Sequence, residues 1–250
     1  MIGINLSLWS AALSKGGYSP IAALGAKLFE YWDADRADTI TQSGGLVSQW
    51  VGLKKGTAVA QVGVPSRPTY SASGFKGRPA VYFDGIDDGL YTTIGAGYFP
   101  DGTQPCEMYV LVDNTAPGTD ATQRTAFYYG DGANGDRRLR RAQGAGNVSR
   151  GQCAAGSGSG VFSVLDNTVD LTGRHVIRGR FTANTAFVSV DSSSEAQFAV
   201  IPATTITRVA IGGLFTTAQQ FQGGIAAALI TSPLTAQERS ALEAWLNARR

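Results

Sequence analysis

The sequence predicts an all-β sandwich that is covered by a single C-terminal helix. Short apolar runs alternate with turn residues along most of the chain, which is typical of short antiparallel strands. The 250 residues include 32 glycines, and only 16% of them are charged. This composition is unusual for a helical protein, and the length allows one domain with a sizeable core.

Strands are expected where apolar and polar residues alternate between turn signals. In segment 79–84, Val81 and Phe83 would share one face, and Asp84-Gly85 would begin a tight turn. A hairpin turn is expected at 182–185, and the glycine-rich run 144–160 is either an exposed loop or a weakly paired strand. The full set of predicted strands is 28–32, 46–51, 68–70, 79–84, 89–93, 106–113, 124–130, 136–142, 147–153, 160–165, 173–181, 185–191, 196–200, 205–212 and 221–231.

The two ends of the chain differ from this pattern. Residues 1–27 predict an extended arm with one short helical turn at 20–27, ordered by docking on another chain. The C-terminus predicts a helix over 235–249, in which Thr235 and Glu238 form a capping box. Its apolar stripe, which would lie on the sandwich, consists of Leu242, Trp245 and Leu246.

Several short motifs follow one another in an ordered series. Segment 78–90 has the sequence RPAVYFDGIDDGL. It is preceded by YWDAD at 31–35 and by VSQW at 47–50. The runs IGG at 211–213, FQGGI at 221–225 and LTAQE at 234–238 follow it. In this order the motifs resemble those of laminin-G-like domains across most of residues 28–250. The chain departs from the family pattern at two places. Arg174 stands where the family has tryptophan, and segment 188–191 lacks the family's final glycine.

The resemblance implies a concanavalin A-like jelly roll at 28–250, preceded by the docking arm at 1–27. Chains with this beginning and this domain resemble virion proteins of tailed bacteriophages. We therefore expect a non-enzymatic structural protein on the outer surface of a virion, such as a capsid decoration, head-fibre or tail-associated subunit. The arm would bind other virion proteins in a homo-oligomer, and the sandwich would adhere to cell-surface glycans. The alternatives are a free-standing carbohydrate-binding module or lectin, and a glycoside hydrolase.

Charge and hydropathy exclude other partners. The 21 basic and 19 acidic residues give a net charge of +2, which does not predict binding to nucleic acid or to an anionic membrane. The apolar N-terminus lacks the positive region of a signal peptide, and no stretch of about twenty apolar residues predicts a membrane span. A soluble protein that is not exported by the standard route is expected.

Two clusters of aspartates invite a metal interpretation. Asp84, Asp87 and Asp88 lie close together in the sequence, and Ca²⁺ binds grouped carboxylate oxygens. The alternative is that these aspartates bond the backbone of their own turn, with no cofactor. The second cluster, at 33–38, is expected to be a solvated loop.

A sugar site is expected at the loop that follows segment 124–130. Pyranose rings stack on aromatic side chains, while aspartate and asparagine supply hydrogen bonds. Residues of both kinds gather here: Tyr128, Tyr129, Asp131, Asn134 and Asp136.

The carboxylates do not predict a catalytic pair. Glycoside hydrolysis needs two carboxyl groups about 5–10 Å apart. None of the five glutamates stands in the E-x-D-x-(x)-E pattern of glucanases, and Glu107 and Asp113 would be about 20 Å apart on one strand. The glutamates are Glu30, Glu107, Glu195, Glu238 and Glu243.

The remaining reactive residues predict structural roles. Cys106 and Cys153 are expected to be independent thiols, although a bridge between them stays open, and neither has metal-ligand spacing. His175 is expected to be half-buried and hydrogen-bonded. The basic run 137–141 predicts a charged edge strand, or alternatively a surface that docks on an acidic neighbouring subunit.

Overall fold

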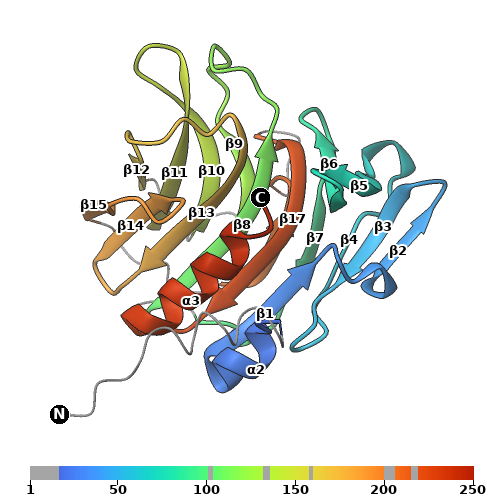
Figure 1. Ribbon diagram of the computed structural model, residues 1–250, viewed down its shortest axis with the longest axis horizontal. Coiled ribbons are helices and arrows are strands. Elements are labelled where there is room, and N and C mark those ends of the chain that lie inside the picture. Colours follow the sequence, from blue (N-terminus) through green and yellow to red (C-terminus); the bar gives the residue numbers. More distant parts are fainter. Residues whose placement is uncertain (1–16, 101–103, 132–135, 158–159, 200–205, 215–218) are drawn as a thin grey trace.

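The computed structural model describes residues 17–100, 104–131, 136–157, 160–199, 206–214 and 219–250. Within these ranges, seventeen antiparallel strands form one hydrogen-bonded network that folds into two facing layers (Figure 1). The strands are β1 (Leu28–Asp33), β2 (Ile40–Ser43), β3 (Leu46–Val51), β4 (Ala58–Ala60), β5 (Thr69–Phe75), β6 (Arg78–Asp84), β7 (Leu90–Thr93), β8 (Cys106–Asn114), β9 (Arg124–Gly130), β10 (Asp136–Gly144), β11 (Val148–Ser157), β12 (Gly160–Leu165), β13 (Gly173–Phe181), β14 (Thr185–Val190), β15 (Ala196–Ala199), β16 (Arg208–Ile211) and β17 (Gln222–Thr231). The predicted concanavalin A-like jelly-roll sandwich is confirmed.

Each layer has a continuous strand order. In the first layer the order is β15-β14-β13-β8-β17, and both β1 and β6 pair with β17. In the second layer it is β12-β11-β10-β9-β16-β7-β4-β3-β2. The layers join where β3 meets β5, at the pair Leu46 and Thr69.

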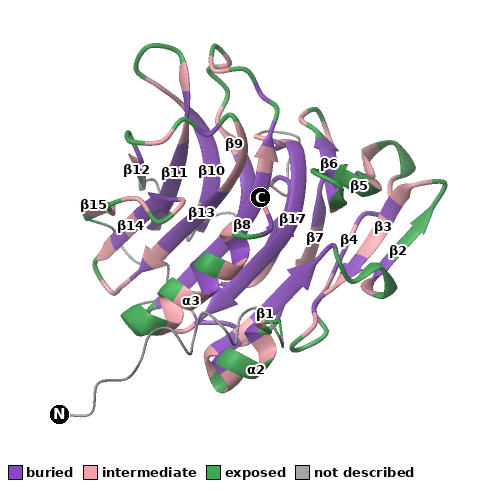
Figure 2. Ribbon diagram, viewed as in Figure 1, coloured by how far each residue is buried: buried purple, intermediate pink, exposed green. Residues whose placement is uncertain are grey.

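Strand β8 explains how the first layer is buried on both faces. Met108, Val110 and Val112 point into the core between the layers. Tyr109 and Leu111 point to the opposite face, where a second apolar cluster forms under helix α3 (Ala236–Asn247). A strand with both faces covered reads as a continuous apolar run, and Figure 2 shows the buried strands of this layer behind α3.

Helix α3 forms as the capping residues predict. The Thr235 side chain accepts a hydrogen bond from the Glu238 backbone, and the Glu238 carboxylate accepts one from the Thr235 backbone. Leu242 and Leu246 are buried against the first layer, and Trp245 packs at the edge of this contact. None of the described helices is long and apolar enough to cross a membrane.

Part of the predicted arm packs on the chain's own domain. Helix α2 (Pro20–Leu24) and the 3-10 turn Gly25–Lys27 confirm the short helical segment, and Leu24 is buried in the cluster under α3. Residues 1–16, the rest of the predicted arm, lie outside the described residues. Docking of the arm on another chain stays a prediction.

Strand β10 corrects the prediction of a charged edge strand. It lies between β9 and β11 and pairs with both. Its arginines can be buried there because they find hydrogen-bond acceptors inside the protein. Arg137 donates to the Gln104 carbonyl at 2.9 Å, and Arg141 donates to the Pro117 carbonyl at 2.5 Å. A buried guanidinium is tolerated where oxygen atoms accept its hydrogen bonds.

The acidic cluster at 33–38 also differs from the solvated loop that was expected. Asp33 is buried, and its carboxylate lies 2.5 Å from Arg249 at the chain's end; Asp35 lies 3.0 Å from the same guanidinium. Asp35 and Asp38 remain exposed, and Asp38 pairs with Arg36 at 2.7 Å. A distant arginine that the local sequence cannot reveal therefore organises this loop.

Candidate functional site

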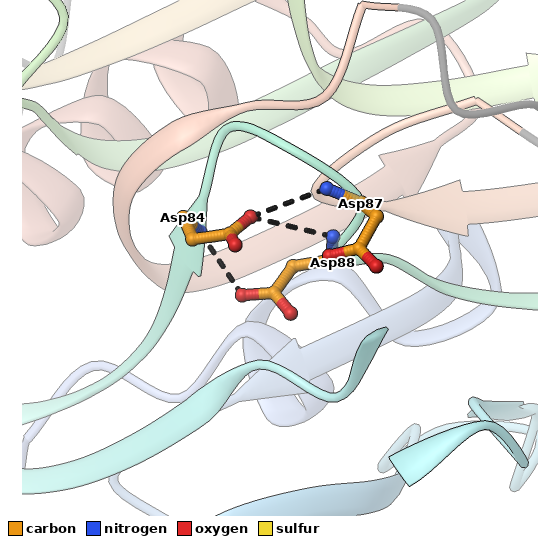
Figure 3. Close-up of side chains that lie close together, drawn as sticks. All are labelled: Asp84, Asp87 and Asp88. Atoms are coloured by element: carbon orange, nitrogen blue, oxygen red, sulfur yellow. Dashed lines mark hydrogen bonds between the residues drawn. The ribbon is translucent and has the colours of Figure 1, made fainter. Parts of the chain in front are cut away.

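The aspartates of the turn after β6 accept hydrogen bonds from the backbone of their own turn, which is the alternative to the metal interpretation. Asp84 Oδ1 accepts hydrogen bonds from the backbone N–H groups of Ile86 at 2.8 Å and Asp87 at 3.3 Å. Asp88 Oδ2 accepts from the Asp84 N–H at 2.9 Å (Figure 3). These bonds close the turn without a ligand.

The same three carboxylates could hold a cation. One oxygen from each of Asp84, Asp87 and Asp88 lies within 4.8 Å of the others. Burial raises the pKa of Asp88 to about 6, and the negative charges of Asp84 and Asp87 add to this shift. A bound cation would lower that pKa, because it favours the charged carboxylate. Calcium binding here stays a prediction.

The predicted stacking of sugars on Tyr128 and Tyr129 is wrong. The Tyr129 ring lies in the core, 5.7 Å from the Phe99 ring, and its hydroxyl donates to the Pro100 carbonyl. The Tyr128 side chain is only 1% exposed, so neither ring can stack on a ligand. The physical reason differs for the two rings: Tyr129 points into the core with Phe127, and Tyr128 packs beside the Arg138 guanidinium, which lies 5.7 Å from its ring centroid.

The other residues of this predicted site are spread over the end of β9 and the start of β10. Asp131 is half-buried directly after β9. Asn134 lies outside the described residues, and Asp136 is described only by its backbone, which pairs with Gly130 and Gly156. Of these three residues, only the Asp131 side chain can be placed, and its part in a sugar site stays a prediction.

The face of the second layer that points away from the core gathers polar and aromatic side chains. Phe127, Leu139, Val209 and Ile211 point into the core, so the side chains that alternate with them point outward. The pairing register places Tyr91, Ala210, Tyr128 and Arg138 next to one another across four strands. We call its solvent-reaching part the outer face; it consists of Tyr91, Thr93, Arg138 and Arg208, whereas Tyr128, Arg140 and Gln152 on the same side of the sheet are buried.

Arginines and an amide organise the middle of the outer face. The Arg138 guanidinium lies 5.7 Å from the centroid of the Tyr128 ring. Both Arg138 and Arg140 donate to Gln219 Oε1, at 3.3 and 3.4 Å. Tyr91, Arg138 and Arg208 are half-buried, so part of each side chain reaches solvent.

This arrangement suits recognition of hydroxyl-rich ligands. Arginine presents several donors in a fixed plane, and a tyrosine offers both a flat apolar ring and a hydroxyl. Sequence reasoning missed Tyr91 and Arg208 because they meet only through pairing of β7 with β16. The available signal was the alternation within residues 90–93 and 208–211, which places both side chains opposite core residues.

The glutamates are all held in structural contacts. Glu30 accepts from the backbone N–H groups of Lys54 at 2.8 Å and Thr57 at 2.9 Å, which shapes the loop after β3. Glu238 caps α3 and binds Lys27, and these contacts hold its pKa at about 2. Arginines bind the other three, with N–O distances of 2.6–2.8 Å for the pairs Arg239–Glu107, Arg178–Glu195 and Arg178–Glu243.

The histidine and the cysteines have the surroundings that the sequence predicts. His175 Nδ1 lies 2.6 Å from Asp191, and Nε2 lies 3.0 Å from the Thr172 carbonyl oxygen. Cys106 and Cys153 are buried free thiols, and burial raises the pKa of both. A thiol kept protonated in this way is a poor nucleophile.

Comparisons with known proteins identify the fold but no family. The sequence matches no family model, and no curated protein matches it. Among solved structures, domain 4 of AbnA, a GH43 extracellular arabinanase from Geobacillus stearothermophilus in complex with arabinotriose, aligns with a TM-score of 0.53 and 14% identity. That alignment covers 87% of this chain and 98% of the domain.

Two larger enzymes contain a similar unit. An arabinofuranosidase complexed with arabinofuranosyl-α-1,2-xylobiose has a TM-score of 0.56 and 12% identity over 91% of this chain. Trypanosoma rangeli sialidase in complex with sialic acid has a TM-score of 0.60 and 13% identity over 91% of this chain. The chain spans only 60% of the first enzyme and 34% of the second, so these likenesses describe the fold alone.

Proposed function

We propose that the chain is a non-catalytic, glycan-binding module. The observation that carries this proposal is the similarity over almost the full length of an isolated domain whose structure contains arabinotriose. A domain of the same size and fold that holds an oligosaccharide is a closer guide than the whole enzymes, because fold alone does not define chemistry.

The outer face is the proposed binding surface. Its half-buried Tyr91 can pack a ring against the C–H groups of a sugar, and Arg138 and Arg208 can donate hydrogen bonds to hydroxyl oxygens. Asp131, at the end of β9, adds an acceptor beside the outer face, because the neighbouring Gly130 pairs with Arg208. Helix α3 covers the corresponding face of the first layer.

The absence of catalysis is part of the proposal. Each glutamate is bound by an arginine, a lysine or backbone N–H groups. A general acid in glycoside hydrolysis needs a raised pKa. The pKa values of Glu195 and Glu238 are instead lowered by their partners.

A glycan array with the full chain tests the proposal, followed by titration of the strongest binder. Tyr91→Ala and Arg208→Ala are each expected to weaken binding about tenfold or more, which corresponds to about 1.4 kcal/mol. Tyr91→Phe keeps the ring, and Arg36→Ala removes an exposed arginine that pairs with Asp38 and is not part of the outer face. Both control variants are expected to bind normally; equal affinity in all four variants would contradict the assignment of the surface.

A place in a tailed-phage virion is the finer part of the proposal. No comparison speaks for it, and it depends on residues 1–16 docking on another virion protein. Deletion of these residues is expected to abolish incorporation into particles while the sandwich stays folded, measured by gel analysis of purified particles. Unchanged incorporation of the deletion variant would rule out the arm as an anchor.

A further inference from the structure

A groove separates α2 from α3 beside the first layer. Its cavity is about 300 Å³, lined by Tyr18, Ala23 and Leu24 on one side and by Thr235, Glu238 and Ala241 on the other. The Lys27–Glu238 ion pair, at 2.7 Å, ties the two sides together. The lining is therefore mainly apolar on the α2 side, whereas Thr235, Gln237 and Glu238 add polar groups on the α3 side.

Tyr18 gives the groove an unsatisfied polar group. Its ring lies 5.8 Å from the Trp245 ring, and its buried hydroxyl has no hydrogen-bond partner among the described residues. Burial raises the pKa of Tyr18 to about 12, so the hydroxyl stays protonated and remains a donor. A buried hydroxyl without an acceptor costs about 1–3 kcal/mol, which favours an occupant that supplies one.

The chain carries an occupant of suitable chemistry. Residues 1–16 precede Gly17 and Tyr18, so this segment begins at the rim of the groove. It contains one charged side chain, Lys15, and residues 2–13 contain none. Its large apolar residues are Ile2, Ile4, Leu6, Leu8, Trp9 and Leu13.

We propose that in the free chain, before any docking on another protein, the groove between α2 and α3 binds the apolar N-terminal segment, residues 2–13, of the same chain. The five residues from Leu13 to Tyr18 can span up to about 17 Å, which is enough to cross the cavity. A backbone carbonyl of the segment would accept the Tyr18 hydroxyl proton in a hydrogen bond. The short tether gives the segment a millimolar effective concentration, so it outcompetes the same segment of a second copy at micromolar protein.

Disulfide trapping in the full chain tests this proposal. In the test variant, Ala12→Cys is combined with Gln237→Cys on the groove. In the control variant, Ala12→Cys is combined with Ala145→Cys on the turn between β10 and β11, which lies at the opposite end of the molecule from α2 (Figure 1). The native thiols are buried and do not interfere. The groove pair is expected to form an intrachain disulfide at least tenfold faster than the control pair, at a rate independent of protein concentration.

Either of two results would overturn the proposal. Disulfide-linked dimers would place a second copy in the groove, and equal rates for the two pairs would leave the groove without this occupant.

A second measurement uses trypsin, because Lys15 is the only basic residue before Lys27. Ala241→Trp fills the groove and is expected to speed the release of peptide 1–15 about tenfold. The control is Ala244→Trp, at an exposed position of the same helix, which is expected to leave the release rate unchanged. Equal release rates for the two variants would also contradict the proposal.

Discussion

At the scale of single residues, Gly151 sets how closely the two layers approach. It lies in β11, inside the glycine-rich run whose structure the sequence left open. A Cβ atom at this position would lie 2.4 Å from Val190 Cγ2 on β14, in the facing layer. The glycine therefore allows a close contact across the core.

Gly151→Ala is expected to destabilise the protein by about 1–3 kcal/mol, because the added methyl group must push the layers apart. Urea unfolding measures the change. Gly95→Ala is the matched control, since no atom lies within 4 Å of its Cβ position. Equal stability of the two variants would contradict the close contact.

The raised pKa of Asp88 has a consequence for stability. Its usual pKa of 3.8 rises to about 6 in the fold, so the folded state holds the proton longer than the unfolded state does. Stability is therefore lost as the pH rises from about 4 to about 6. Asp88→Asn is expected to gain about 1–2 kcal/mol over the natural chain at pH 7.5 and nothing at pH 3.5, measured by urea unfolding. The same difference at both pH values would contradict this.

At the scale of elements, buried ion pairs fasten α3 to the sandwich. Glu107 of β8 is fully buried, and Arg239 of α3 binds both of its oxygens at 2.6 and 3.0 Å. Tyr109 and the Leu234 backbone donate to the same carboxylate. The helix thus depends on a polar contact as well as on Leu242 and Leu246.

Arg239→Met is expected to cost about 3 kcal/mol, because it leaves the buried Glu107 carboxylate without its cation. The free energy of unfolding from urea titrations measures the loss. Arg36→Met removes an exposed ion pair with Asp38 and is expected to leave the stability unchanged. A comparable loss in both variants would show that burial of the pair is not what matters.

Local patterns predict most strands, and their failures have local causes. Strand β2 was missed because only Ile40 of its four residues is buried, and β4 because it has three residues. The position of β10 was mistaken because the acceptors of Arg137 and Arg141 come from distant loops. Tyr129 shares the inward parity of Phe127, a sign that the sugar-site prediction did not use.

At the scale of the whole molecule, the sandwich presents two different outer surfaces. Helices α2 and α3 cover the first layer, whereas the second layer carries Tyr91 and two arginines, Arg138 and Arg208, on its outer face. The resemblance to jelly-roll domains predicts the sandwich, but the outer face requires the pairing of β7, β16, β9 and β10. Strands that far apart in sequence acquire a common surface only in the folded chain.

The most direct measurement is to titrate the full chain with arabinotriose and with the best array ligand while assaying for released sugar. The glycan-binding account predicts saturable binding to at least one oligosaccharide, weakened by Tyr91→Ala, without any hydrolysis product. If no glycan binds saturably, the result would contradict the proposed function. Release of sugar by the natural chain would contradict the proposal that it is non-catalytic.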